Sequence, residues 1–135
     1  MCPLLSFSMG DSTVIIDDSD LVQYIILIKT KGFSTGALIA QGSHASVSAI
    51  WLSKDLEFTK KYCSPEKIDH MHKITLEAPS REILEELSTS LNNAKPAIVH
   101  KLWIELPESI PTALATAPMP RAILKPFFTA LKLLR

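Results

Sequence analysis

The sequence has few of the residues that mark several common protein classes. Its 135 residues include two cysteines, Cys2 and Cys63, which are too few for a disulfide framework and have no zinc-ligand spacing. No apolar run approaches the ~20 residues that cross a bilayer, so no membrane partner is predicted. The first ten residues are apolar but lack a basic segment, and we expect no secretory signal. These absences favour a cytoplasmic protein.

Net charge is also absent, because fourteen basic residues balance fourteen acidic ones. A zero balance argues against a generic polyanion binder. The acids are unevenly placed, however. Residues 1–20 contain no Lys or Arg and four aspartates, namely Asp11, Asp17, Asp18 and Asp20. Residues 21–135 therefore hold fourteen bases against ten acids, a balance of +4, and we predict an acidic, disordered arm over 1–20 joined to one mildly basic domain over 21–135.

Motifs for metals and nucleotides are missing as well. The sequence contains no Walker motif, no G-x-G-x-x-G and no G-x-S-x-G. His70 and His72 form an isolated H-x-H, and we expect no metal site there.

Hydrophobic patterning predicts alternating strands and helices. The expected strands are 22–28, 72–77, 97–104 and 112–117. The expected helices are 36–53 with Ser34 or Thr35 as cap, 54–63, a helix capped by Ser80, and an amphipathic tail over 121–135 in which Pro126 starts or kinks the helix. This order predicts a single layered α/β domain, with a four-stranded mixed sheet flanked by helices on both faces and a C-terminal helix.

Candidate site residues lie near the expected turns. Gln41 and His44 are three apart, so they share one face of the first helix and could touch one bound group. Equally, they could make a structural hydrogen bond or be exposed. Glu105 follows a strand end, where ligands of α/β sheets gather, and Ser109 and Thr112 come next. This segment fits acid–base chemistry or an ordinary polar loop. Lys29 and Lys31, after the first strand, could meet phosphate or only water.

The stretch Gly36-Ala37-Leu38-Ile39-Ala40-Gln41-Gly42-Ser43-His44-Ala45 resembles the G-K-x-A-A-Q-C-x-H-A signature of type 2 peptidyl-tRNA hydrolases. The resemblance covers roughly residues 23–120 and follows a strand of the same type. The segment L-W-I-E-L-P-E and the tail are most similar to the divergent peptidyl-tRNA hydrolase domain-containing branch. Members of the family cleave the ester between a peptide and the 3′ end of tRNA without a metal or other cofactor.

The resemblance implies roles for individual residues. The family's glutamine and histidine match Gln41 and His44, and its strand-end aspartate matches Glu105. Its two threonines match Ser109 and Thr112, and its basic residue after the first strand matches Lys29. By implication the first five residues are catalytic and Lys29 binds the acceptor end of peptidyl-tRNA. Lys31, which follows the same strand, is expected to bind there too. The family's active-site lysine, however, matches Ala37.

The departure at Ala37 leaves two functions open. The first is a slow peptidyl-tRNA hydrolase, in which Gln41, Ser109 and Thr112 donate hydrogen bonds and Glu105 or His44 acts as base. The alternative is a catalytically weak or inactive module that binds tRNA ends or a protein. Dimerisation through the sheet or the tail is an open alternative to a monomer.

Overall fold

The structure, a computed structural model, describes residues 4–9, 12–29 and 32–135. At its centre is a six-stranded mixed sheet with the order β5-β6-β3-β4-β8, and β7 pairs with β3 beside that path. The strands are β3 (Leu21–Ile28), β4 (Lys73–Ala78), β5 (His100–Glu105), β6 (Ile110–Thr116), β7 (Met119–Pro120) and β8 (Lys132–Leu133). β3 and β4 are parallel and the other pairs are antiparallel, so the prediction of a mixed sheet in an α/β domain is confirmed.

The predicted count of four strands is wrong. The four expected strands are present as β3, β4, β5 and β6, and the sheet has β7 and β8 in addition. Each of these has two residues, which is too short for the alternation of polar and apolar residues that signals a strand.

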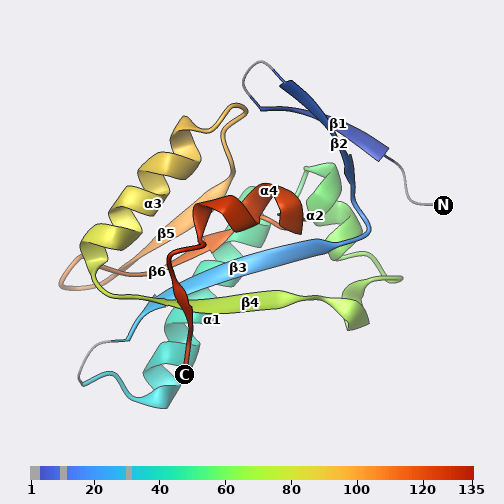
Figure 1. Cartoon of the computed structure of the whole chain (residues 1–135). Coiled ribbons are helices and arrows are strands. Elements are labelled where there is room, and N and C mark those ends of the chain that lie inside the picture. Colours follow the sequence, from blue (N-terminus) through green and yellow to red (C-terminus); the bar gives the residue numbers. More distant parts are fainter. Residues whose placement is uncertain (1–3, 10–11, 30–31) are drawn as a thin grey trace.

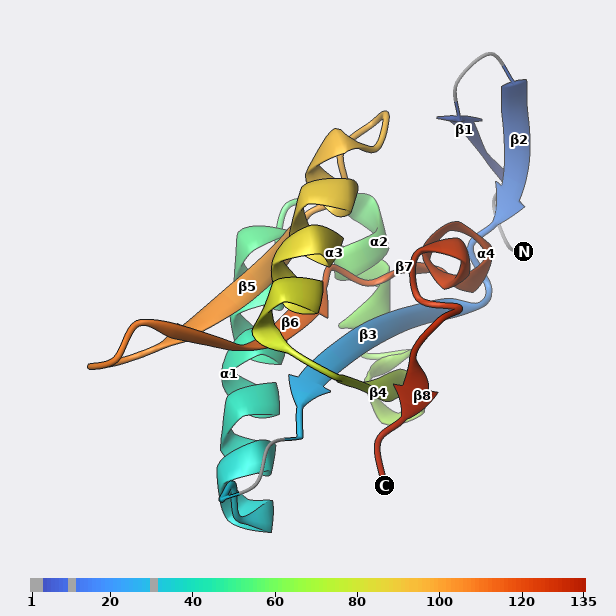
Figure 2. The ribbon, with the colours of Figure 1, turned by 60° about the vertical axis from the view of Figure 1, so that its left-hand side comes forward.

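Helices cover both faces of the sheet, as predicted (Figures 1 and 2). α1 (Thr35–Leu52) packs on β5, β6 and β3 from one side. α3 (Arg81–Asn93) and the short α4 (Arg121–Leu124) pack on the other side. The short α2 (Glu57–Tyr62) and the 3-10 turn η1 (Ile68–His70) connect α1 to β4.

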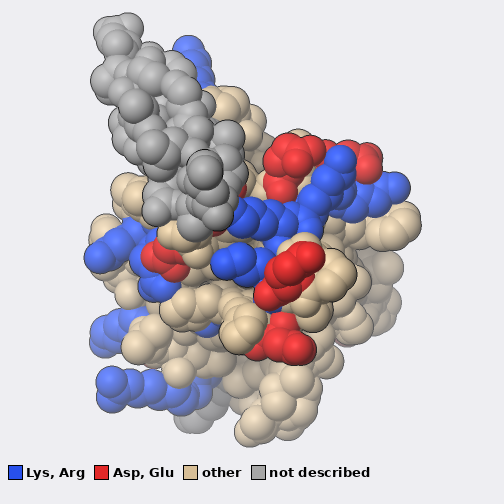
Figure 3. Space-filling view, turned by 90° about the vertical axis from the view of Figure 1, so that its right-hand side faces the viewer, with Lys and Arg blue, Asp and Glu red and all other residues tan. Residues whose placement is uncertain are grey.

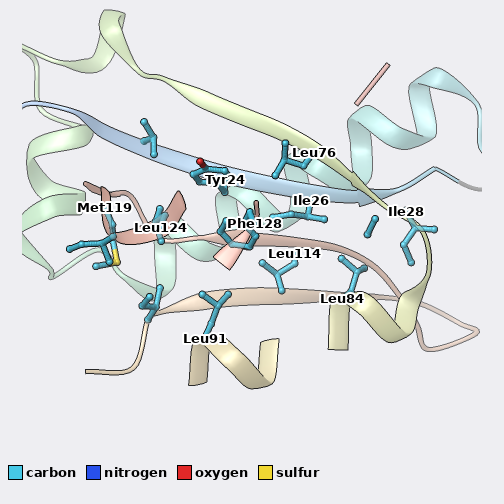
Figure 4. Close-up of a cluster of buried hydrophobic side chains, with 14 residues drawn as sticks. Tyr24, Ile26, Ile28, Leu76, Leu84, Leu91, Leu114, Met119, Leu124 and Phe128 are labelled. Carbon is cyan, nitrogen blue, oxygen red and sulfur yellow. The ribbon is translucent and has the colours of Figure 1, made fainter. Parts of the chain in front are cut away.

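Alternation along β3 divides the buried side chains between two cores. Ile25 and Leu27 face α1 and pack with Ala45 and Ala49. Tyr24, Ile26 and Ile28 face the other way, into the larger core shown in Figure 4 with Leu84, Leu91, Leu114, Leu124 and Phe128. A strand buried on both faces explains the near-continuous apolar run from which it was predicted.

Both long helices begin at the predicted caps. The Ser34 hydroxyl accepts a hydrogen bond from Ala37 N, and the Ser80 hydroxyl accepts one from Ile83 N. Each serine therefore satisfies one backbone donor that the first turn of its helix leaves without a partner.

The tail over 121–135 is not a long helix, and that prediction is wrong. α4 ends at Leu124, and the 3-10 turn η2 (Lys125–Phe127) follows it. Pro126 has no N–H and restricts the residue before it, so the regular helix stops there. The chain then returns to the sheet as β8, beside β4. The predicted apolar contacts are nevertheless made, since Ile123, Leu124 and Phe128 are buried in the larger core.

The segment predicted as an arm contains a two-stranded antiparallel sheet of β1 (Leu4–Met9) and β2 (Ser12–Asp17). Its last two acids contact the domain. Asp18 is buried and pairs with Lys61 Nζ at 2.8 Å, and Asp20 pairs with Arg121 Nε at 2.8 Å. The arm is thus joined to the domain by two ion pairs, and the proposed boundary at residue 20 stays a prediction.

Candidate active site

A buried hydrogen bond joins Gln41 on α1 to Thr112 on β6. The Thr112 hydroxyl donates to Gln41 Oε1 at 2.8 Å, and the two residues are 71 positions apart in the sequence. Gln41 is 9% exposed and Thr112 is 3% exposed, so the pair lies at the inner edge of the helix–sheet interface. The structure therefore brings together two of the five predicted catalytic residues.

A β-bulge places Thr112 at this position. Trp103 pairs with Ala113 and Ile104 pairs with Pro111, which leaves Thr112 as the extra residue of β6. Ala113 faces α1, so regular alternation would point Thr112 away from that helix. The bulge redirects the side chain, and the hydroxyl reaches Gln41.

This pairing leaves the donors of Gln41 free. Because Thr112 donates to the amide oxygen, both N–H groups of Gln41 Nε2 remain for another acceptor. Within the part of the chain that the structure describes, no group accepts a hydrogen bond from them. Two fixed donors of this kind are suited to an oxygen that gains negative charge.

His44 lies one helical turn beyond Gln41 and stacks on Trp103 of β5. The ring centroids are 4.7 Å apart and the planes are inclined by 25°. His44 is exposed, whereas Trp103 Nε1 is buried and, over residues 4–9, 12–29 and 32–135, has no hydrogen-bond partner. No local signal in the sequence predicts this contact between Trp103 and His44.

Glu105 and Ser109 are not bonded to this pair. Glu105 ends β5 two positions after Trp103, so alternation places it on the side of the sheet that faces α1. Ser109 is exposed in the turn before β6, with a φ of 58°, a value uncommon outside glycine. Among the described residues neither side chain has a hydrogen bond or ion pair.

The two predicted tRNA-binding lysines lie elsewhere. Lys29 follows β3, and its amine donates to the backbone carbonyl oxygen of Arg135. It lines a large cavity to which neither Gln41 nor Thr112 contributes. Lys31 falls outside the described residues.

A smaller cavity of about 400 Å³ adjoins Thr112 at the carboxyl ends of β3 and β4. Its wall comprises Ile28, Phe33, Pro79, Ser80, Arg81, Ile110, Pro111 and Thr112. Ligands of open α/β sheets gather at this end of parallel strands. Arg81 is therefore a cation beside the candidate site that sequence reasoning missed, because its charge looks like that of any exposed residue in a first helical turn.

Two classes of site are not found in the described part of the chain. No group of three or more His, Cys, Asp or Glu side chains is placed to hold a metal ion there. None of its helices is long and apolar enough to cross a membrane.

Comparison with known proteins gives consistent matches. The sequence model of the family Peptidyl-tRNA hydrolase PTH2 matches residues 21–134. A Mus musculus protein named "Putative peptidyl-tRNA hydrolase PTRHD1" is 36% identical over 111 residues, which cover 78% of this chain and 76% of that protein. A Homo sapiens protein of the same name is 37% identical over 106 residues, which cover 75% of this chain and 73% of that protein.

Proposed function

The chain belongs to the Peptidyl-tRNA hydrolase PTH2 family, and on that premise we propose that it hydrolyses the ester between a peptide and the 3′ end of tRNA. The observation that carries the proposal is the buried Thr112–Gln41 hydrogen bond, which fixes the amide and leaves its two N–H groups unused. The expected substrate is peptidyl-tRNA bound by its acceptor end.

The proposed reaction is an attack by water on the ester carbonyl carbon. His44 takes a proton from the water, and Gln41 Nε2 donates hydrogen bonds to the carbonyl oxygen as it gains negative charge. The ester C–O bond then breaks, and the leaving ribose oxygen receives the proton from His44. The products are a peptide with a free carboxyl group and a tRNA with a free 3′ hydroxyl. Thr112 acts as a positioning residue, because its proton is used on Gln41.

His44 is the better placed of the two candidate bases. It shares the α1 edge of Gln41, and stacking on Trp103 limits its ring to a few orientations. Glu105 lies on the same side of the sheet without a fixed contact, and it stays the second candidate. His44→Asn should therefore lower turnover far more than Glu105→Gln; the reverse order would transfer the role of base to Glu105.

Ala37 explains why the proposed enzyme would be slow. It precedes Gln41 by four residues, so the two side chains are neighbours on one helix edge. The family resemblance places a lysine there, and alanine supplies no charge for an oxyanion or a terminal phosphate. Arg81, in the wall of the adjoining cavity, pairs with Glu82 through Nε at 3.3 Å, and its other guanidinium nitrogens could meet a tRNA phosphate, together with the predicted contacts of Lys29 and Lys31. Ala37→Lys should raise turnover.

The test is release of N-acetylated amino acid from its tRNA by the purified chain at low salt. Gln41→Glu keeps the size of the side chain but removes both donors, so turnover should fall by about 10²–10³-fold. Asn92→Asp makes the same amide-to-acid change at the exposed end of α3 and should leave turnover unchanged. Absence of release above background would overturn the proposal. Salt-dependent tRNA binding without turnover would instead support the binding-module alternative.

A further inference from the structure

A cavity of about 670 Å³ lies between α1 and the open part of the sheet. Ile25 and Leu27 of β3 and Thr75 of β4 contribute from the sheet, and the chain's last two residues, Leu134 and Arg135, line it too. Its size lies within the range of small-molecule sites, about 300–1,000 Å³. Figure 2 shows the C-terminal segment beside β4, at the edge of the sheet, and Leu134 packs there with the side chains that face α1.

This cavity is separate from the candidate active site. Residues of an α-helix are about 100° apart around its axis. Gln41 and His44 therefore lie on one edge of α1, while Ile39 and Ser46 lie on the opposite edge and line the cavity. Gly42, between these edges, faces the sheet, where an added Cβ would meet Ile25 at 3.5 Å. The helix itself stands between the two sites.

The cavity wall combines apolar side chains with cations. Its apolar members are Ile25, Leu27, Leu38, Ile39, Val47 and Leu134. Its charged members are Lys29, Lys73 and Arg135, and no aspartate or glutamate lines it. None of these three side chains pairs with an Asp or Glu carboxylate among the described residues, although Lys29 donates to the main-chain oxygen of Arg135. Cationic side chains around an apolar space match a ligand with the opposite charge and an apolar body.

Lys73 is an exposed residue in the wall of this cavity, and fixed contacts hold its ammonium group. Its Nζ donates to Gln23 Oε1 at 2.5 Å and lies 5.3 Å from the centre of the Tyr62 ring. The Gln23 amide in turn donates to the backbone oxygens of Ser46 and Thr116, at 3.1 and 3.0 Å. A network with partners on α1, β6 and β4 keeps the ammonium group in place before any ligand arrives.

We propose that the cavity binds a free amphipathic anion, an unbranched alkyl chain ending in a carboxylate. The chain would lie against the β3 and α1 side chains, and the carboxylate would accept a hydrogen bond from Lys73. The desolvation that lowers the pKa of Lys73 in the empty cavity would be offset by an adjacent anion. This binding does not depend on the proposed hydrolysis.

The test compares three ten-carbon probes below their micelle-forming concentrations: decanoate, decanol and decyltrimethylammonium. Calorimetry measures affinity, and methyl NMR of the wild-type chain locates the bound probe. Decanoate should bind saturably and move the methyl signals of Ile25, Leu27 and Leu38, while the cationic probe should bind at least about tenfold more weakly. Equal binding of the two charged probes, no saturable decanoate binding, or shifts confined to other methyl groups would overturn the proposal.

Two variants and a matched control refine this experiment. Thr75→Phe keeps a β-forming residue on β4 and fills the cavity, so it should weaken decanoate binding by at least about tenfold. Lys73→Gln should weaken it about fivefold, as expected for one partly exposed ion pair. Lys101→Gln removes a charge from β5 outside the cavity and should have no effect. Unchanged decanoate affinity in both cavity variants would contradict the assignment, and the wild-type NMR map stands even if Thr75→Phe fails to fold.

Discussion

At Thr112 one hydroxyl group joins α1 to β6, and it does so because β6 has one residue more than β5 at this point. The bond is buried, so loss of the hydroxyl would leave the Gln41 amide oxygen without a partner and out of contact with water. Stability and the orientation of the Gln41 donors therefore depend on the same hydrogen bond.

Thr112→Val tests both consequences. The variant should be less stable by about 1–3 kcal/mol, the usual cost of a buried polar group without a partner. If Gln41 is the oxyanion donor, turnover should also fall by about 10²-fold, because the amide is free to rotate. Thr112→Ser keeps the hydroxyl, so it should retain most of the stability and most of the turnover of the wild type. Urea unfolding and the release assay measure the effects. Unchanged turnover in a destabilised Thr112→Val would limit this residue to a structural role.

Tyr62 gives a stability prediction at alkaline pH. Burial raises its pKa from 10.0 to about 12, and its hydroxyl donates to the His72 backbone oxygen at 2.9 Å. The folded state therefore prefers the neutral phenol, and the resulting stability is present below pH 10 and lost as the pH rises toward 12. Tyr62→Phe should show a smaller fall in unfolding free energy between pH 10.5 and 12.

The chosen window separates Tyr62 from Lys73. Desolvation lowers the pKa of Lys73 below 10.5, so its effect has the opposite sign and ends near pH 10.5. Tyr24, whose pKa is also raised by burial, is present in both chains and cancels in the comparison. Parallel urea-unfolding curves for wild type and Tyr62→Phe across this window would show that Tyr62 does not have the raised pKa.

The site residues differ in how far the sequence could predict them. Gln41 and His44 were predicted as neighbours from helical spacing alone, and α1 has them one turn apart. The contact of Thr112 with Gln41 depends on a bulge, which arises from the pairing of two strands and leaves no mark in either sequence. The His44–Trp103 stack likewise needs the packing of α1 on β5.

Among the helices and strands, the two long helices can be predicted from their local sequence. A serine cap and helical spacing of apolar residues set the start of α3, and both are visible within one turn of sequence. The structure of the tail cannot be predicted from local sequence in this way. Pro126 breaks the regular helix, while tertiary contacts still bury Ile123 and Phe128. Its final pairing with β4 depends on a sheet edge that the tail's own residues do not encode.

Ser80→Ala measures the contribution of the α3 cap. Loss of the hydroxyl that accepts from Ile83 N should lower the unfolding free energy by about 1 kcal/mol. Ser90→Ala, at an exposed position inside the same helix, should be neutral or slightly stabilising, since alanine has the higher helix propensity. Equal effects of the two substitutions in urea unfolding would show that Ser80 does not cap the helix.

For the whole molecule, the formal net charge of zero is the sum of an acidic arm and a basic domain. Asp18 and Asp20 are paired with Lys61 and Arg121 on the domain, so their charges count with those of the domain. Residues 18–135 hold fourteen bases against twelve acids, a balance of +2, and the remaining acids are Asp11 and Asp17. Figure 3 shows acidic and basic side chains interspersed across the middle of one face, with no broad patch of one sign. Such a surface favours a local contact with tRNA over binding along its length.

The double substitution Asp11→Asn with Asp17→Asn tests whether the arm opposes that contact. It changes the net charge from zero to +2 and leaves the two ion pairs with the domain intact. If the arm lies near the bound tRNA, affinity at low salt should rise about threefold, and the difference should disappear at high salt, where charges more than a few ångströms apart are screened. Equilibrium binding of acylated tRNA across a salt series measures this. Equal affinities at every salt concentration would mean that the arm's acids lie too far from the tRNA to act on it, and that the domain's own charge alone sets the contact.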